Sequence, residues 1–166
     1  MTSAGLHHAC VRVTNIEKSA RFYVQAFDGR LLTRPFLLEG ASAEDTTGGP
    51  PGVRFKICHV GFARGAVELF EFVEPVHEFE VLHFSRANAL HFALQVDDVA
   101  DALRCVEAAG GRRLWPQISE WDTAHFMYVA DLDGNVLELL DASSLRIAEI
   151  TGESYPESRV KAAGQA

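Results

Sequence analysis

The stretch that decides the fold is LHHACVRVTN at residues 6–15, because a related stretch, ALHFALQVDD, follows at residues 89–98. A second related pair lies further along each half: AVELFE at residues 66–71 and VLELLD at residues 136–141. An internal repeat determines the architecture before any single element is assigned. The sequence therefore predicts two copies of one structural unit.

The spacing of the repeat supports a duplication. His8 precedes His91 by 83 residues, and Ile16, in the first expected helix, precedes Val99 by the same 83. The two later stretches are only 70 residues apart, so the second copy is shorter between its helix and its last strand. The Gly- and Pro-rich stretch 39–52 is where we expect the first copy to carry its extra residues.

Composition and charge limit the classes of protein that fit. The chain has 166 residues, of which 48% are hydrophobic and 23% charged, as is typical of a globular protein. A net charge of -8 argues against binding to nucleic acid or an anionic membrane. The three cysteines show no CxxC spacing, and the first residues do not resemble a signal peptide. We therefore expect a cytoplasmic protein without a membrane span.

The first unit is predicted to have the order βαβββ. Residues 6–13 have the β-branched pattern of a strand, and Asn15 is a suitable N-cap for the helix that follows. The apolar face of that helix consists of Ile16, Ala20, Tyr23 and Phe27. Residues 39–52 are expected to form a long loop. Three further strands are expected at residues 31–38, 55–62 and 66–73.

The second unit repeats this order in fewer residues. Its helix is expected to begin after Asp98 and to end before the Gly110-Gly111 pair. Its strands are expected at residues 90–96, 113–115, 125–130 and 136–140. The chain is accordingly divided into a first module at residues 1–74, a connection at 75–88, a second module at 89–142 and a tail at 143–166. The tail is expected to hold a short helix at residues 145–150.

Alternation along the strands selects one histidine in each half. His8 shares a strand face with Cys10 and Arg12, whereas His7 shares the other face with apolar residues. In the second copy, His91 lies on the more polar face of its strand. The repeat therefore pairs His8 with His91, and His7 is interpreted as a packing residue.

The same comparison selects one glutamate in each half. Glu68 aligns with Glu138, which lies inside an apolar strand where a carboxylate is costly unless it is paired or bound to metal. Glu71 aligns with Asp141 near the strand ends, where solvation is easier. Glu71 remains an alternative to Glu68 at this point.

Two histidines and two glutamates at matched positions of a duplicated unit predict a divalent metal site. Imidazole and carboxylate ligands without thiolate suit Zn, Ni, Co, Mn or Fe(II), and they do not choose among these metals. Four other side chains could line the same cleft or pack structurally: His59, Trp121, His125 and Phe126. Arg12, on the face of His8, could bind a substrate anion or pair with a nearby carboxylate.

The chain resembles the vicinal oxygen chelate superfamily, also called the glyoxalase/bleomycin-resistance/dioxygenase fold. The resemblance covers about residues 6–141 and is closest in pattern to the glyoxalase I and methylmalonyl-CoA epimerase-like branch. One departure is Leu132 in Asp131-Leu132-Asp133-Gly134, where the common pattern has proline, and we expect it to affect only the geometry of the turn. The segments that carry the resemblance are residues 6–13, 16–23, 67–70, 90–99 and 131–139.

The resemblance implies an α+β fold in which two tandem βαβββ modules form a curled mixed sheet around a metal cleft. It implies four metal ligands: His8, Glu68, His91 and Glu138. It implies a lyase or isomerase that binds a small substrate through vicinal oxygens and transfers a proton by way of a metal-stabilised enediolate. Glu138 would move the proton, with Glu68 as its partner on the opposite face. A homodimer is expected, and the ligands could come from one chain or from two.

Two other functions within the superfamily remain open. An extradiol-type ring-cleaving dioxygenase would bind Fe(II) through His8, His91 and Glu138, although the missing proline and the presence of Glu68 argue against it. A bleomycin-resistance-like protein would bind a drug without catalysis, and such proteins usually lack the metal ligands. Stoichiometric metal would separate the enzymes from the binding protein.

Overall fold

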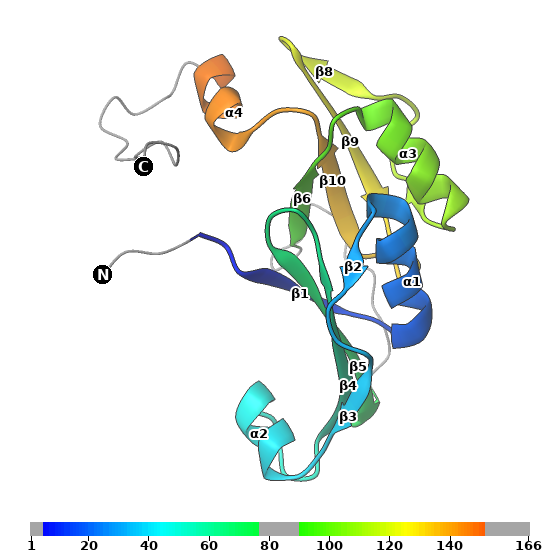
Figure 1. The fold of residues 1–166 in the computed structure, drawn as a ribbon, viewed down its shortest axis with the longest axis vertical. Helices are drawn as coiled ribbons and strands as arrows, with labels where there is room; N and C mark the ends of the chain where they lie inside the picture. Colours follow the sequence, from blue (N-terminus) through cyan, green and yellow to red (C-terminus); the bar gives the residue numbers. More distant parts are fainter. Residues whose placement is uncertain (1–4, 77–89, 152–166) are drawn as a thin grey trace.

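The first half of the chain forms a five-stranded mixed sheet, in a computed structural model that describes residues 5–76 and 90–151 (Figure 1). Strand β1 pairs in parallel with β5, and β5 pairs antiparallel with β4. Two short strands, β2 and β3, each pair antiparallel with β4. The bounds of these strands are β1 His8–Arg12, β2 Arg30–Leu31, β3 Phe36–Leu38, β4 Arg54–Gly61 and β5 Ala66–Glu74.

The second half forms a matching sheet. Strand β6 pairs in parallel with β10, as β1 does with β5, and β10 pairs antiparallel with β9. Strands β7 and β8 both pair antiparallel with β9. The bounds are β6 His91–Gln95, β7 Arg112–Arg113, β8 Ser119–Trp121, β9 Ala124–Ala130 and β10 Val136–Leu140. The two mixed sheets confirm the predicted α+β fold with repeated modules.

Each module places one long helix on the same side of its sheet. Helix α1 (Ile16–Phe27) begins where the side chain of Asn15 accepts a hydrogen bond from the Lys18 amide. Helix α3 (Val99–Ala108) begins in the same way at Asp98. These caps satisfy amide groups that have no partner inside a helix.

The two modules share one apolar core. Helices α1 and α3 contact each other, and Figure 1 shows them together on one side of the molecule. One cluster of buried side chains includes Tyr23 of α1, Leu69 of β5, Val106 of α3 and Leu139 of β10. Because these residues come from both halves, the modules are fixed against each other by their helical side.

A buried polar network adds to this contact. The carboxylate of Asp131, in the turn before β10, accepts a hydrogen bond of 2.9 Å from the buried Tyr23 hydroxyl. The backbone amides of Asp133 and Asn135 also donate to Asp131. The Asn135 side chain donates in turn to the carbonyl of Arg12, at the end of β1. The turn of the second module is therefore tied to the first helix and strand of the first.

The expectation of a loop over residues 39–52 is wrong in its first half. Helix α2 (Ala41–Thr47) occupies that stretch and ends at Gly48, whose φ of 61° suits glycine. The helix forms because Ala43 is fully buried in a second cluster of side chains with Val53 and Phe55. Tertiary burial therefore stabilises a helix too short to be stable alone.

Three other elements differ from the predicted ones. The strand expected over residues 31–38 is divided into β2 and β3, and Pro35, which has no amide hydrogen to donate, lies between them. The strand expected at residues 113–115 is observed as β7, at Arg112–Arg113. Strand β8 was not predicted. The C-terminal helix is confirmed as α4 (Ser144–Thr151).

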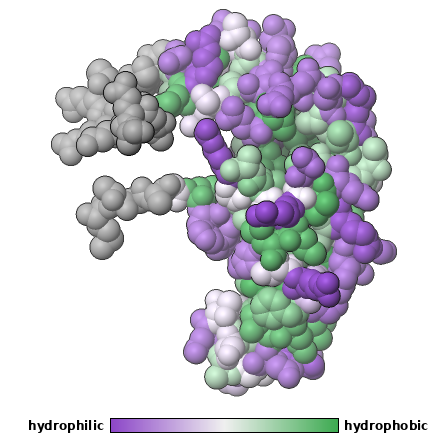
Figure 2. All heavy atoms as spheres, viewed as in Figure 1, coloured by the Kyte–Doolittle hydropathy of each residue, from purple (hydrophilic) through white to green (hydrophobic). Residues whose placement is uncertain are grey.

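Parts of the predicted organisation lie outside the described residues: residues 77–88 of the connection and residues 152–166 of the tail. Among the residues that the structure describes, no helix is long and apolar enough to cross a membrane. Figure 2 shows apolar side chains over the lower part of the visible face, where β3 and β4 lie in Figure 1. Four half-exposed apolar residues belong to this half of the molecule: Leu31, Leu32, Phe36 and Leu37.

Candidate metal centre

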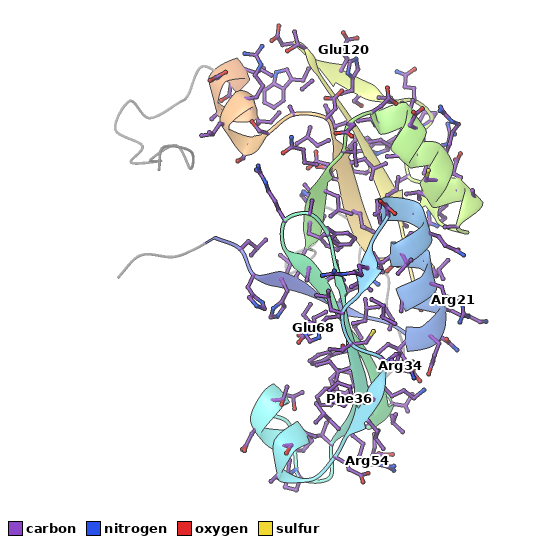
Figure 3. The ribbon with its side chains drawn as sticks, in the orientation of Figure 1. Arg21, Arg34, Phe36, Arg54, Glu68 and Glu120 are labelled. Atoms are coloured by element: carbon purple, nitrogen blue, oxygen red, sulfur yellow. The ribbon has the colours of Figure 1, made fainter. Side chains whose placement is uncertain are left out.

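The first pair of site residues lies on neighbouring parallel strands. His8 begins β1, and Glu68, labelled in Figure 3, lies on β5 opposite Cys10. His8 Nε2 lies 3.4 Å from Glu68 Oε2. Leu69, the next residue of β5, is buried in the core beneath the helices. Because successive side chains of a strand point to opposite faces, Glu68 and the neighbouring His8 lie on the sheet face turned away from α1.

The second module repeats this geometry. His91 begins β6, and Glu138 lies at the middle of β10. His91 Nε2 lies 3.6 Å from Glu138 Oε2. The side chain of Glu138 is 17% exposed and that of Glu68 is 14% exposed, so each carboxylate is largely buried beside one more exposed histidine.

Glu71 has a different environment from Glu68. Its carboxylate accepts a hydrogen bond of 2.7 Å from the Ile16 amide, at the first turn of α1. It also lies 3.1 Å from Lys56 Nζ, and this hydrogen bond is the main reason that the pKa of Lys56 is raised. Glu71 thus faces the helical side and stabilises the start of α1.

The two glutamates have further polar neighbours that differ between the modules. His59 Nε2, on β4, lies 2.9 Å from Glu68 Oε1. Burial, with the charge and hydrogen bond of Glu68, raises the pKa of Cys10 to about 11, so the thiol stays protonated at neutral pH. Burial and a hydrogen bond to Glu138 raise the pKa of Tyr128.

The contacts of His59 and Tyr128 with the glutamates were not predicted, although the register of the two hairpins indicates them. His59 pairs with Glu68 across the β4–β5 hairpin, and Tyr128 pairs with Glu138 across the β9–β10 hairpin. Residues directly opposite in an antiparallel pair share a face and lie close together. Counting outward from each turn would therefore have placed both side chains beside the glutamates.

Aromatic rings lie on the same sheet face as each pair. Phe55 stacks on Phe70 with 4.6 Å between ring centroids, and the Arg12 guanidinium lies 5.3 Å from the centroid of Phe72. Arg12 thus has an aromatic neighbour, as in a cation–π contact. In the second module, Trp115 lies 4.6 Å from Tyr128, whose ring is 5.1 Å from that of His91. Such walls lower the local dielectric and strengthen electrostatic interactions at the site.

Three other residues were expected to line the cleft or to pack structurally. Phe126 lies beside Tyr128, with 6.4 Å between ring centroids, whereas His125 and Trp121 lie elsewhere. His125 Nδ1 is 2.7 Å from Asp141 Oδ2, and this hydrogen bond raises the pKa of His125. Trp121 ends the short strand β8 and is 47% exposed.

The donor atoms present fit a divalent metal ion. Each module offers one imidazole nitrogen and one carboxylate oxygen, which are common ligands of Zn and related metals. Two ligand atoms that are each about 2.1 Å from one ion lie about 3 to 3.5 Å apart. The separations of 3.4 Å and 3.6 Å are close to this range.

The chain does not bring the two pairs together into one cluster. Among residues 5–76 and 90–151, no group of three or more His, Cys, Asp or Glu side chains is arranged to hold a metal ion. His59 does not complete such a group with His8, because it contacts the other oxygen of Glu68 and the two imidazole centroids are 6.0 Å apart. Each module therefore carries one separate His–Glu pair.

Comparison with known sequences now places the chain in a family. The Glyoxalase/Bleomycin resistance protein/Dioxygenase superfamily matches residues 5–139, which is most of the sequence. The chain belongs to this superfamily. The repeated modules and the matched His–Glu pairs are thus features of a superfamily member.

The similarity to known proteins extends over most of the chain. A lactoylglutathione lyase of Neisseria meningitidis serogroup A is 29% identical over 143 residues, which cover 84% of this chain and 91% of that protein. A probable lactoylglutathione lyase of Vibrio cholerae is 27% identical over 145 residues, covering 84% and 92%. The crystal structure of a glyoxalase family protein from Bacillus cereus superposes with a TM-score of 0.73 at 14% identity, covering 84% of this chain and 95% of that one. This last similarity shows the fold.

Proposed function

We propose that the protein is a metal-dependent lyase or isomerase of the glyoxalase type. The observation that carries the proposal is the pair of matched His–Glu contacts, His8 with Glu68 and His91 with Glu138. These four side chains would hold one divalent ion. The ion, when bound, would supply Lewis-acid stabilisation of negative charge on two neighbouring substrate oxygens.

Glu138 is proposed to carry the proton. Its carboxylate lies on the open face of β10 and is 17% exposed, so a substrate carbon can reach it. It would take a proton from the carbon next to a carbonyl and return that proton to the neighbouring carbon, so that the product is an isomer of the substrate. Glu68 would remain in place on the other side. The aromatic walls would exclude water during the transfer.

A second copy of the chain is proposed to complete the site. The shared core of α1 and α3 and the hydrogen bond between Tyr23 and Asp131 hold the two modules by their helical sides. In this packing, the two His–Glu pairs form no common cluster among residues 5–76 and 90–151. In a two-fold dimer, the first module of one copy can face the second module of the other, which gives two equivalent four-ligand sites.

The names of the relatives suggest the first substrate to test. Both are called lactoylglutathione lyases, so we propose a hydroxyacyl thioester such as lactoylglutathione as the product class. Lactoylglutathione is an isomer of the adduct between glutathione and methylglyoxal. Its formation by proton transfer agrees with the role given to Glu138.

The proposal is tested by metal content and activity on the same samples. Tag-free protein purified without chelator should hold about one divalent ion per chain and should form the thioester from the glutathione–methylglyoxal adduct. His91→Ala should lose both, whereas His125→Ala, which removes a histidine paired with Asp141 outside the site, should lose neither. Absence of metal after reconstitution with Zn, Ni, Co, Mn and Fe would overturn the proposal. Activity with Fe(II) and a catechol alone would favour the dioxygenase.

A further inference from the structure

His59 contacts the carboxylate oxygen of Glu68 that His8 leaves free. Its Nε2 is 2.9 Å from Oε1, whereas His8 Nε2 is 3.4 Å from Oε2. Strand register fixes this arrangement, because His59 and Glu68 are direct partners in the β4–β5 ladder. One oxygen of Glu68 is therefore occupied by a neighbour on the same sheet, and the other is directed to the histidine of the proposed metal site.

Tyr128 occupies the matching place in the second module. It is the direct ladder partner of Glu138, and its hydroxyl is hydrogen-bonded to that carboxylate. The two modules thus place a partner of the glutamate at the same position, but the residue is histidine in one and tyrosine in the other. The neighbours on the parallel strands differ as well. Glu68 pairs with Cys10 on β1, whose thiol is hydrogen-bonded to Glu68, whereas Glu138 pairs with Ala93 on β6.

We infer that His59 is a positioning residue, which holds Glu68 through Oε1 so that Oε2 faces the metal. This inference rests on the proposed function. In this role, the Nε2–H of His59 would donate to Oε1 of Glu68, from which it lies 2.9 Å away. A ligating carboxylate that is itself hydrogen-bonded keeps its orientation and costs less entropy when it binds an ion.

The surroundings of His59 favour this role over that of a surface ion pair. The side chain is 25% exposed, and its partner Glu68 is 14% exposed. Its neighbours on the same face of β4 are the buried Phe55 and Ile57. A hydrogen bond to a carboxylate in such a place is stronger than one in water.

The difference between the modules also indicates different roles for the two glutamates. Glu68 has two donors, His59 and Cys10, whereas Ala93 gives Glu138 nothing in place of Cys10. Glu68 would therefore be the carboxylate that keeps its place when a metal is bound, and Glu138, which has one donor fewer, would be the one that accepts the proton. This asymmetry comes from side chains outside the four proposed ligands.

The test compares His59→Phe with His59→Gln. Phenylalanine keeps a ring at the site but removes the donor, while glutamine can place an amide N–H near the position of Nε2. The backbone contacts of residue 59, to the Thr33 hydroxyl and the Leu32 amide, are available to either variant. The melting temperature of the metal-free proteins checks that both variants are folded.

Co²⁺ is the probe, because its visible absorption reports the ligand geometry as well as the affinity. His59→Phe should weaken Co²⁺ binding by about 10- to 100-fold and change the absorption spectrum, and His59→Gln should recover most of the affinity. The kcat of the Co²⁺-loaded protein should fall less than its Co²⁺ affinity in His59→Phe. Equal Co²⁺ affinity and equal spectra in the parent and His59→Phe would overturn the inference about His59 but not the proposed function. Absence of Co²⁺ binding by the parent would overturn the proposed function with it.

Discussion

At the scale of single residues, Glu68 and Glu71 show how a shift of three positions along one strand changes the role of a carboxylate. Glu68 lies beside His8 and His59 on the open face of β5. Glu71 lies on the helical face, where it accepts a hydrogen bond from the Ile16 amide and pairs with Lys56. The two glutamates should therefore respond differently to the same substitution.

Glu71→Ala should lower the free energy of unfolding by about 1 kcal/mol, because the first turn of α1 loses an acceptor. Its metal content should equal that of the parent. Glu68→Ala should show the opposite result, with metal lost and the stability of the metal-free protein changed less. Urea denaturation of metal-free protein and elemental analysis measure the two effects. A Glu71→Ala variant that loses metal while Glu68→Ala keeps it would contradict this assignment.

His125 provides a test of pH dependence away from the site. Its hydrogen bond to Asp141 raises its pKa above the ordinary 6.5, so the folded protein binds this proton more tightly than the unfolded chain. The stabilisation is therefore complete below pH 6.5 and is lost as the pH rises through the folded pKa. Asp141→Asn should lower the pKa of His125, as followed by NMR titration of its ring protons. An unchanged titration curve would show that the contact is not formed in solution.

At the scale of elements, the sequence predicted those parts whose pattern is local. The spacing of Ile16, Ala20 and Tyr23 marks the buried face of α1, and all three are buried. The repeat placed β10 at residues 136–140, which the structure confirms. The repeat also paired His8 with His91, and Glu68 with Glu138, as equivalent positions, and the structure places each histidine beside the glutamate of its own module.

Helix α2 could not be predicted in this way, because its stability depends on distant residues. Its sequence is flanked by glycines and contains two threonines, which are weak helix formers. Burial of Ala43 against Val53 and Phe55 makes the helix stable, and that contact is known only once the chain has folded. The contacts of His59 and Tyr128 with the glutamates were not predicted for a different reason. They depend on the register of each hairpin, which has to be counted from its turn.

The turn Asp131–Gly134 does more than connect β9 to β10. Asp131 is almost fully buried, and burial raises its pKa although hydrogen bonds from Asn135 and Tyr23 act in the opposite direction. Asp133 accepts hydrogen bonds from the backbone amide and hydroxyl of Thr14. The turn therefore joins the two modules through polar contacts, of which the hydrogen bond between Tyr23 and Asp131 is buried.

Tyr23→Phe tests this connection. It removes the hydroxyl that donates to Asp131 at 2.9 Å and leaves a buried carboxylate with one donor fewer. The free energy of unfolding should fall by about 1 to 3 kcal/mol, as measured by chemical denaturation. Tyr128→Phe is the matched control, because Tyr128 is only partly buried and should cost less. Equal stability of Tyr23→Phe and the parent would show that the network does not hold the modules together.

At the scale of the whole molecule, the chain carries two His–Glu pairs on two sheets that share one core, and we propose that each pair is half of a metal site. The positions of the four ligands could be proposed from the repeat, since each pair depends only on neighbouring strands. The sequence could not predict whether the two pairs meet within one chain, because that depends on how α1 packs against α3. The observed packing joins the two modules through the contact of α1 with α3 (Figure 1), and the two His–Glu pairs form no common cluster among the residues that the structure describes.

The measurement that tests the central claim most directly is complementation of the two half-sites, followed by metal content. One variant carries His8→Ala with Glu68→Ala, and the other carries His91→Ala with Glu138→Ala. Each alone should bind no stoichiometric Co²⁺, since every site of its dimer lacks one pair. After equal amounts are unfolded together and refolded, random pairing should restore about a quarter of the parental Co²⁺ content, because half of the dimers are mixed and each has one intact site. A mixture that stays free of metal, when the refolded parent binds it, would contradict a site shared between two copies.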